Sequence, residues 1–173
     1  MTTKIDRLPT VSPKPAPSRP GASVLIIESR FYSHIADELL RGAVDWLTAA
    51  GAKYERVTVP GALEIPQALS GAVAAGIIPR GADQGRFDGV VALGCVIRGE
   101  TSHYDIVCNN ANHWLMDVAI RNNIPVGNGI LTVDTEAQAM ARARGGSKGK
   151  GGDAAAACLR LVELAHQFAG QGS

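Results

Sequence analysis

The chain has 173 residues, of which 46% are hydrophobic and 19% are charged, a balance typical of one globular domain with a sizeable core. Its formal net charge of +1 gives no reason to expect nucleic acid or a membrane surface as a partner. No apolar run reaches the roughly 20 residues that span a bilayer, and prolines interrupt the N-terminus where a signal peptide would lie, so we expect a cytoplasmic protein.

The first half of the chain alternates between strand and helix patterns. Residues 1–21 carry five prolines and no apolar periodicity, which predicts a flexible arm ahead of a single domain over 22–169. The patterns then predict a strand at 23–27, a helix capped by Ser33 and stopped by Gly51, a strand at 54–59, a helix at 64–75 and a loop at 76–87.

The second half continues the alternation. It predicts a strand at 88–95, a helix at 103–122, a strand at 125–132 and a short helix at 136–144. A flexible basic loop should follow at 145–152, and then a last helix capped by Asp153. We expect the helix at 103–122 to bury Ile106, Val107, Trp114, Leu115 and Val118. We expect the last helix to bury the stripe Ala157, Leu161, Leu164 and Phe168.

Four strand–helix repeats predict a parallel sheet with helices on both faces, a three-layer α/β sandwich of flavodoxin-like architecture. Ligands of such sheets bind beyond the carboxyl ends of the strands. The segments to search are therefore 28–32, 60–64, 94–103 and 127–134.

The richest of these segments is Gly94–Cys108, which reads G-C-V-I-R-G-E-T-S-H-Y-D-I-V-C. Thr101 and Ser102 lie where a helix begins, and its unpaired N–H groups and positive dipole end could hold an anion. His103 could move protons near neutral pH. The alternative is that a hydroxyl merely caps the helix and His103 is a solvated residue, and the spacing does not decide between them.

Other strand ends offer binding groups, each with a structural alternative. Phe31 could stack on a planar heterocycle or close the edge of the core. Glu64 could accept hydrogen bonds from hydroxyls or interact with its helix dipole. Arg142 belongs to a basic cluster that could bind phosphate or be a solvated surface.

The sequence lacks the motifs that would support several other classes of α/β protein. The segment after the first strand lacks a flavodoxin's phosphate loop, no clustered aspartates suit a phosphoacceptor domain, and no G-x-G-x-x-G opens a helix. Cys95, Cys108 and Cys158 form no CxxC pair or metal-ligand cluster, so we expect no metal and buried free thiols.

Taken together, five segments resemble the 6,7-dimethyl-8-ribityllumazine synthase family over about residues 22–168. They are S-R-F-Y, V-P-G-A-L-E-I-P, G-C-V-I-R-G-E-T-S-H-Y-D, G-I-L-T-V-D and A-R-A-R-G-G-S-K-G-K-G-G-D-A-A-A-A. The resemblance implies a transferase of riboflavin biosynthesis. It would condense 5-amino-6-(D-ribitylamino)uracil with 3,4-dihydroxy-2-butanone 4-phosphate, release phosphate, and need no cofactor. It also implies a homopentamer with active sites between subunits.

The resemblance also assigns roles to residues. Phe31 matches the aromatic that stacks on the pyrimidine, and Glu64 the acceptor for the ribityl hydroxyls. His103 matches the proton-transfer residue, and Arg142 the phosphate-binding arginine of the neighbouring subunit. The remaining matches are the ribityl segment Gly61, Ala62 and Leu63, the pyrimidine-binding backbone of Val96 and Ile97, the loop residues Glu100, Thr101 and Ser102, and Lys150.

Some positions depart from the family pattern. Asn128 stands where many members have a second aromatic, and Leu63 replaces a common phenylalanine. These departures motivate an alternative, a catalytically weak paralogue that binds flavin or lumazine or forms a structural oligomer. The choice between Lys148 and Lys150, an assembly larger than a pentamer, and docking to riboflavin synthase stay open.

Overall fold

The computed structural model describes residues 21–79 and 85–170, so the expected arm over residues 1–20 lies outside the described part, as do 80–84 within the expected loop and 171–173. The elements, in chain order, are β1 (Ser23–Ser29), α1 (Ser33–Ala49), β2 (Lys53–Val59), α2 (Glu64–Ala74), β3 (Gly89–Ile97), α3 (His103–Arg121), β4 (Val126–Val133), α4 (Glu136–Ala143), the 3-10 helix η1 (Gly146–Lys148) and α5 (Lys150–Gly170).

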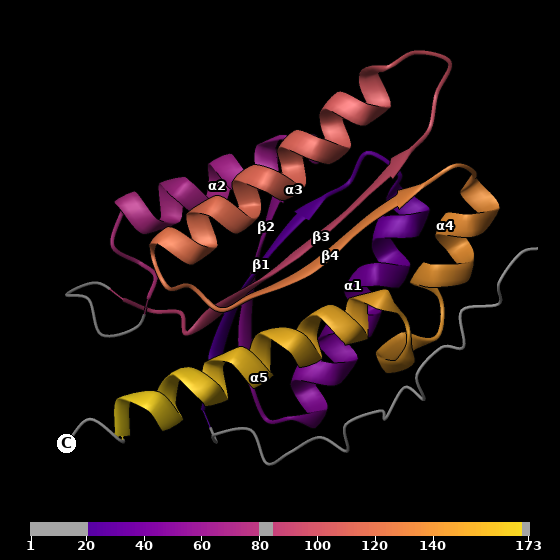
Figure 1. The fold of residues 1–173 in the computed structure, drawn as a ribbon. Coiled ribbons are helices and arrows are strands. Elements are labelled where there is room, and N and C mark those ends of the chain that lie inside the picture. Colours follow the sequence, from indigo (N-terminus) through magenta and orange to yellow (C-terminus); the bar gives the residue numbers. More distant parts are fainter. Residues whose placement is uncertain (1–20, 80–84, 171–173) are drawn as a thin grey trace, which may run out of the picture.

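The four strands form one parallel sheet in the order β2-β1-β3-β4, which confirms the predicted fold class. The chain steps outward from β1 to β2, and then crosses back to place β3 on the other side of β1 (Figure 1). The strand order therefore reverses between β1 and β3. In an open parallel sheet this reversal leaves a crevice at the carboxyl ends of the two strands, where ligands bind.

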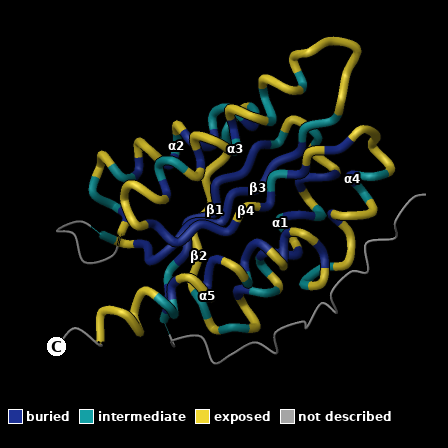
Figure 2. The backbone as a smooth tube through the Cα atoms, viewed as in Figure 1, coloured by how far each residue is buried: buried dark blue, intermediate teal, exposed yellow. Residues whose placement is uncertain are grey.

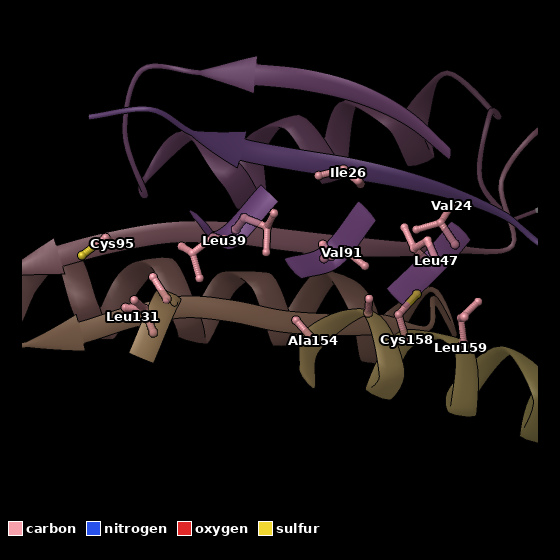
Figure 3. Packing of buried hydrophobic residues seen from close by; sticks show 14 of the residues in the cluster. Val24, Ile26, Leu39, Leu47, Val91, Cys95, Leu131, Ala154, Cys158 and Leu159 are labelled. Carbon is pink, nitrogen blue, oxygen red and sulfur yellow. The ribbon is translucent and has the colours of Figure 1, made fainter. Parts of the chain in front are cut away.

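Helices cover both faces of the sheet. One core cluster lies between the sheet and α1, α4 and α5, and includes Val24, Ile26, Val91, Leu39 and Cys158 (Figure 3). The other lies between the sheet and α2 and α3. Figure 2 shows the buried strands running through the middle of the molecule between these layers. The alternation of side chains along β1 and β3 divides their residues between the two clusters.

The glycine-rich segment at 145–152 is not the loop that the sequence predicted. It forms η1 and the first residues of α5, and Gly151 and Gly152 are buried. A Cβ at Gly151 would lie 1.9 Å from the carbonyl oxygen of Leu39, so only glycine lets α5 approach α1 this closely. Asp153 is not the cap either. It lies inside α5, where its carboxylate pairs with Lys150 Nζ at 3.1 Å.

The predicted burial pattern of two helices is wrong. On α5, Ala157, Leu161 and Phe168 of the predicted stripe are exposed. The buried residues of α5 lie on another face and are Gly151, Gly152, Ala154, Ala155, Cys158, Leu159 and Val162. On α3, Leu115 is buried as expected but Ile106 and Trp114 are exposed. The expected cap Ser33 is instead the first residue of α1, and the N-cap Tyr32 makes no side-chain hydrogen bond.

The edge strand β2 differs from the other three strands. Six of its residues are exposed and only Val59 is half-buried. Tyr54 and Val57 thus present apolar surface beside the open edge of the sheet. None of the helices in the described part of the chain is long and apolar enough to cross a membrane.

Candidate active site

A pocket of about 320 Å³ opens at the carboxyl ends of β1 and β3, where the strand order reverses. Most of the predicted site residues line it: Phe31, Gly61, Ala62, Leu63, Glu64, Val96, Ile97, Thr101 and His103. They come from the ends of three successive strands and the starts of the helices that follow. Their meeting is a consequence of the parallel sheet, which brings all strand ends to one edge.

Phe31 lies directly after β1 and is 72% exposed, so it does not close the edge of the core. Its ring meets Tyr32 edge-on, with the centroids 5.0 Å apart. Most of the Phe31 side chain is thus accessible at the pocket. An exposed aromatic face is suited to stacking on a planar heterocycle.

The turn between β2 and α2 supplies a carboxylate. Glu64 N donates to the carbonyl oxygen of Gly61 at 3.2 Å, which closes the turn and makes Glu64 the first residue of α2. A Cβ at Gly61 would lie 3.0 Å from Glu64 Oε2, so a larger residue there would crowd the carboxylate. The half-buried Glu64 can accept hydrogen bonds from ligand hydroxyls.

The end of β3 offers backbone groups. Its last pairing with β1 is at Leu93, opposite Glu28, whereas the strand continues beside β4 to Ile97. On the edge of β3 that faces β1, Val96 and Ile97 therefore have no paired residue of β1 opposite them. Backbone N–H and C=O groups in such a position can hydrogen-bond a ligand.

The loop between β3 and α3 carries the hydroxyls and the histidine. Ser102 is the N-cap of α3 but makes no side-chain cap bond, and Thr101 Oγ1 accepts a long bond of 3.4 Å from His103 N. The hydroxyls thus contribute little to capping, which was the structural alternative. Glu100 and Ser102 are exposed on either side of Thr101, although they do not line the pocket.

Five pocket residues were not predicted: Tyr32, Cys95, Gly99, Tyr104 and Val107. Cys95 and Tyr104 both lie inside the G-C-V-I-R-G-E-T-S-H-Y-D motif, which was the available signal. Burial raises the pKa of the Cys95 thiol to about 11. Cys95 is therefore a neutral thiol at physiological pH, which argues against nucleophilic chemistry by its sulfur. Burial also raises the pKa of Tyr104, so its hydroxyl stays protonated.

Three predicted residues lie away from the pocket of their own chain. Asn128 donates from Nδ2 to Asn112 Oδ1 at 2.7 Å and so links β4 to α3. Arg142 is exposed on α4 and donates to the carbonyl oxygen of Gln138 at 3.0 Å. Lys150 is exposed and pairs with Asp153, as described above. Within residues 21–79 and 85–170, no three His, Cys, Asp or Glu side chains gather as they would around a metal ion.

The loop that carries Phe31 is supported by a buried carboxylate. Glu28, fully buried at the end of β1, lies 3.2 Å from Arg30 Nη1 and 3.4 Å from Arg56 Nε on β2. Arg30 also contacts Asp37 on α1. These ion pairs tie the end of β1 to its neighbours just before the pocket.

Comparison with known proteins gives one consistent result. The sequence model of the family described as 6,7-dimethyl-8-ribityllumazine synthase matches residues 21–166. Proteins named 6,7-dimethyl-8-ribityllumazine synthase are similar to the chain over most of their length. The one from Methylobacterium radiotolerans is 53% identical over 154 residues, 88% of this chain and 88% of that protein.

Two further relatives carry the same name. The protein from Azorhizobium caulinodans is 54% identical over 146 residues, which is 83% of this chain and 86% of that protein. The protein from Agrobacterium fabrum is 51% identical over 149 residues, which is 85% of this chain and 97% of that protein.

Proposed function

The chain belongs to the 6,7-dimethyl-8-ribityllumazine synthase family, and from this premise we propose that the pocket at the ends of β1 and β3 is its active site. The enzyme is a transferase of riboflavin biosynthesis. It condenses 5-amino-6-(D-ribitylamino)uracil with 3,4-dihydroxy-2-butanone 4-phosphate to 6,7-dimethyl-8-ribityllumazine and releases phosphate. The alternative of a catalytically weak paralogue gains no support from the relatives, which carry the enzyme's name.

The observation that carries the assignment of the site is the meeting of Phe31, Glu64 and His103 around one pocket. The exposed ring of Phe31 stacks on the pyrimidine, while the peptide groups of Val96 and Ile97 bond its edge. Glu64 accepts hydrogen bonds from the ribityl hydroxyls. These contacts fix the amine of the first substrate in front of the loop that receives the second.

The loop before α3 handles the phosphorylated ketone. Glu100, Thr101 and Ser102 surround it, and the N-terminus of α3 favours the negative charge of its phosphate. His103 moves the protons that imine formation, phosphate loss and dehydration require. Holding two substrates in contact supplies much of the remaining rate enhancement.

Arg142, Asn128 and Lys150 act in the pocket of a neighbouring subunit of a homopentamer. All three are exposed and none of them lines the pocket of its own chain, which supports this part of the proposal. So does the apolar surface available for association: Tyr54 and Val57 on the edge strand β2, the exposed Trp114 on α3, and a hollow of about 440 Å³ between α2 and α3. The cytoplasmic location expected from the sequence belongs to the same proposal, and three free cysteines are compatible with a reducing compartment.

The decisive experiment mixes the purified protein with both substrates. We expect release of inorganic phosphate together with the absorbance of the lumazine, and a rate no higher than that of the spontaneous reaction would reject the function. The shared site is tested by Arg142→Ala. Its KM for the phosphorylated ketone should rise roughly ten- to a hundredfold, because a charge-assisted hydrogen bond is worth about 1.5–3 kcal/mol. Unchanged kinetics would remove Arg142 from the site, and light scattering of the wild type would test the pentamer.

A further inference from the structure

Arg98 lies just outside the pocket and contacts three separate groups. Its Nε donates to Asp134 Oδ1 at 2.8 Å, and its Nη1 lies 3.8 Å from Asp105 Oδ1. Its guanidinium also stacks over the ring of Tyr104, with the central carbon 4.2 Å from the ring centroid. The backbone N–H of Arg98 donates to the carbonyl oxygen of Val133 at 2.9 Å. We call the side chains of Arg98, Tyr104, Asp105 and Asp134 the Arg98 clasp.

On one side the clasp holds the loop that carries His103. In the described part of the chain, the hydrogen bonds of residues 99–102 run only to the first turn of α3, from His103 N to Thr101 Oγ1 and from Asp105 N and Ile106 N to the carbonyl oxygen of Ser102. These bonds join the loop to α3 but to nothing else. Arg98 lies at the start of the loop, and its partners Tyr104 and Asp105 lie just after the loop. The contacts between them therefore join the two ends of the loop.

On the other side the clasp holds the start of α4. The carboxylate of Asp134 accepts the hydrogen bond from Arg98 Nε, and the backbone N–H of Asp134 donates to Gln138 Oε1 at 2.8 Å. The carbonyl oxygen of Gln138 in turn accepts from Arg142 Nη1 at 3.0 Å. A continuous set of polar contacts thus leads from the His103 loop to Arg142.

We propose that Arg98 is a positioning residue that holds the His103 loop and the start of α4 in one fixed arrangement. This inference rests on the proposed function, in which His103 works in the pocket of its own subunit and Arg142 works in the pocket of the neighbour. Arg98 then sets the geometry of two adjacent active sites from one position, without touching substrate in either.

An arginine is suited to this task and a lysine is not. The guanidinium is planar, offers N–H groups in several directions and stacks flat on an aromatic ring, so it can serve Asp134, Asp105 and Tyr104 at once. A lysine carries the same charge at a single point and could satisfy one carboxylate. The start of α4 is also held by His34 Nε2, which lies 2.7 Å from Glu136 Oε1 on the exposed surface. Loss of Arg98 should therefore loosen this region without releasing it.

The first test needs no substrate. Amide hydrogen exchange is followed in the assembled wild type, in Arg98→Ala, in Arg98→Lys and in the control Arg121→Ala. Arg121 is a matched control because it is an exposed arginine that pairs with Asp117 at 2.8 Å. It lies at the far end of α3, the helix whose first turn contains the clasp residues Tyr104 and Asp105. In Arg98→Ala, exchange should accelerate roughly fivefold both at 99–106 and at 134–138, as expected for the loss of exposed ion pairs and a cation–π contact. Acceleration in one segment only, or in neither, would overturn the proposal.

The second test is steady-state kinetics with each substrate varied in turn. Arg98→Ala should lower kcat/KM for the phosphorylated ketone about tenfold, because small misplacements of positioning groups can cost up to a hundredfold. The KM for the pyrimidine should change less than about twofold, since Phe31 and Glu64 lie on other loops and Val96 and Ile97 are held by their pairing with β4. Arg98→Lys should recover only part of the loss, and full recovery would show that charge alone suffices and would refute the clasp.

The two tests separate this inference from the proposed function. If the wild type makes no lumazine, the proposed function fails, and hydrogen exchange still decides whether the clasp joins the two segments. If the wild type is active and Arg98→Ala matches both its kinetics and its exchange, the clasp is wrong and the function stands.

Discussion

The substitution Gly151→Ala tests how tightly α5 packs on α1. A Cβ needs about 3.0 Å to a backbone oxygen, and at position 151 it would have 1.9 Å to the carbonyl oxygen of Leu39. The Cβ is bonded directly to the backbone of α5 and the oxygen belongs to the backbone of α1, so neither atom can rotate away to make room. The two helices must move apart, and the apolar contacts between α5 and the sheet must loosen with them.

The size of the effect follows from the rigidity of this contact. Extra atoms in a dense core cost about 1–3 kcal/mol, and a backbone-to-backbone clash lies at the upper end. For a chain of this length, each kcal/mol lowers Tm by about 2–4 °C. We therefore expect Gly151→Ala to melt roughly 6–12 °C below the wild type.

Gly71 provides a matched control. It also lies within a helix, α2, but a Cβ there would have no atom within 4 Å. Alanine is favoured over glycine inside a helix by about 0.5–1 kcal/mol, so Gly71→Ala should raise Tm by about 1–4 °C. The same chemical change is thus expected to have opposite effects at the two positions.

Both variants are compared with the wild type by differential scanning calorimetry at one protein concentration, because association makes Tm depend on concentration. Equal shifts for the two variants, or a Gly151→Ala protein as stable as the wild type, would show that the close approach of α5 and α1 is not what requires glycine.

Three further predictions concern the site and the thiols. Phe31→Ala should raise the KM for the pyrimidine substrate about tenfold, since stacking on an aromatic side chain is worth about 1–3 kcal/mol, and an unaltered KM would mean that the ring does not meet the substrate. His103→Ala should lower kcat by about ten- to a hundredfold, at the low end for acid–base groups because proximity persists, whereas a wild-type kcat would make His103 a bystander. Burial raises the pKa of Cys95 to about 11 and that of Cys158 to about 12. Between pH 9 and those values only the unfolded chain ionises, so urea unfolding should show a loss of stability as pH rises above 9, and a flat profile from pH 8 to 11 would contradict the burial of these thiols.

Apolar patterning was sufficient to predict the sheet and most helices, because the strands β1 and β3 are buried on both faces and read as apolar runs. It failed on α5. The buried face of that helix consists mostly of glycines and alanines, whose small side chains give almost no periodic signal, together with Cys158, Leu159 and Val162. Leu161 and Phe168, which the pattern placed inside, are exposed. On α3 the pattern likewise placed Ile106 and Trp114 on the buried face, but both are exposed.

The pocket could be predicted because parallel strands deliver their ends to one edge, so Phe31, Glu64 and His103 were expected together. The Arg98 clasp could not be predicted in the same way. Asp134 is 36 residues from Arg98. Both follow strands that end at the same edge of the sheet, but the apolar pattern indicates neither that β3 and β4 are neighbours nor that these two side chains pair. The roles of Arg142, Asn128 and Lys150 depend on a second subunit and stay predictions.

All the residues that line the pocket lie at or before Val107 in the sequence. Strand β4 of the sheet and helix α5 come later. On the side of the sheet that faces α1, β3 and β4 are covered by Ala154, Cys158 and Leu159 of α5, as Figure 3 shows. A nascent chain leaving the ribosome thus contains all the residues that line its own pocket before the helix that covers this side of the core has been made. The final helix, none of whose described residues lines this pocket, therefore completes the core behind it.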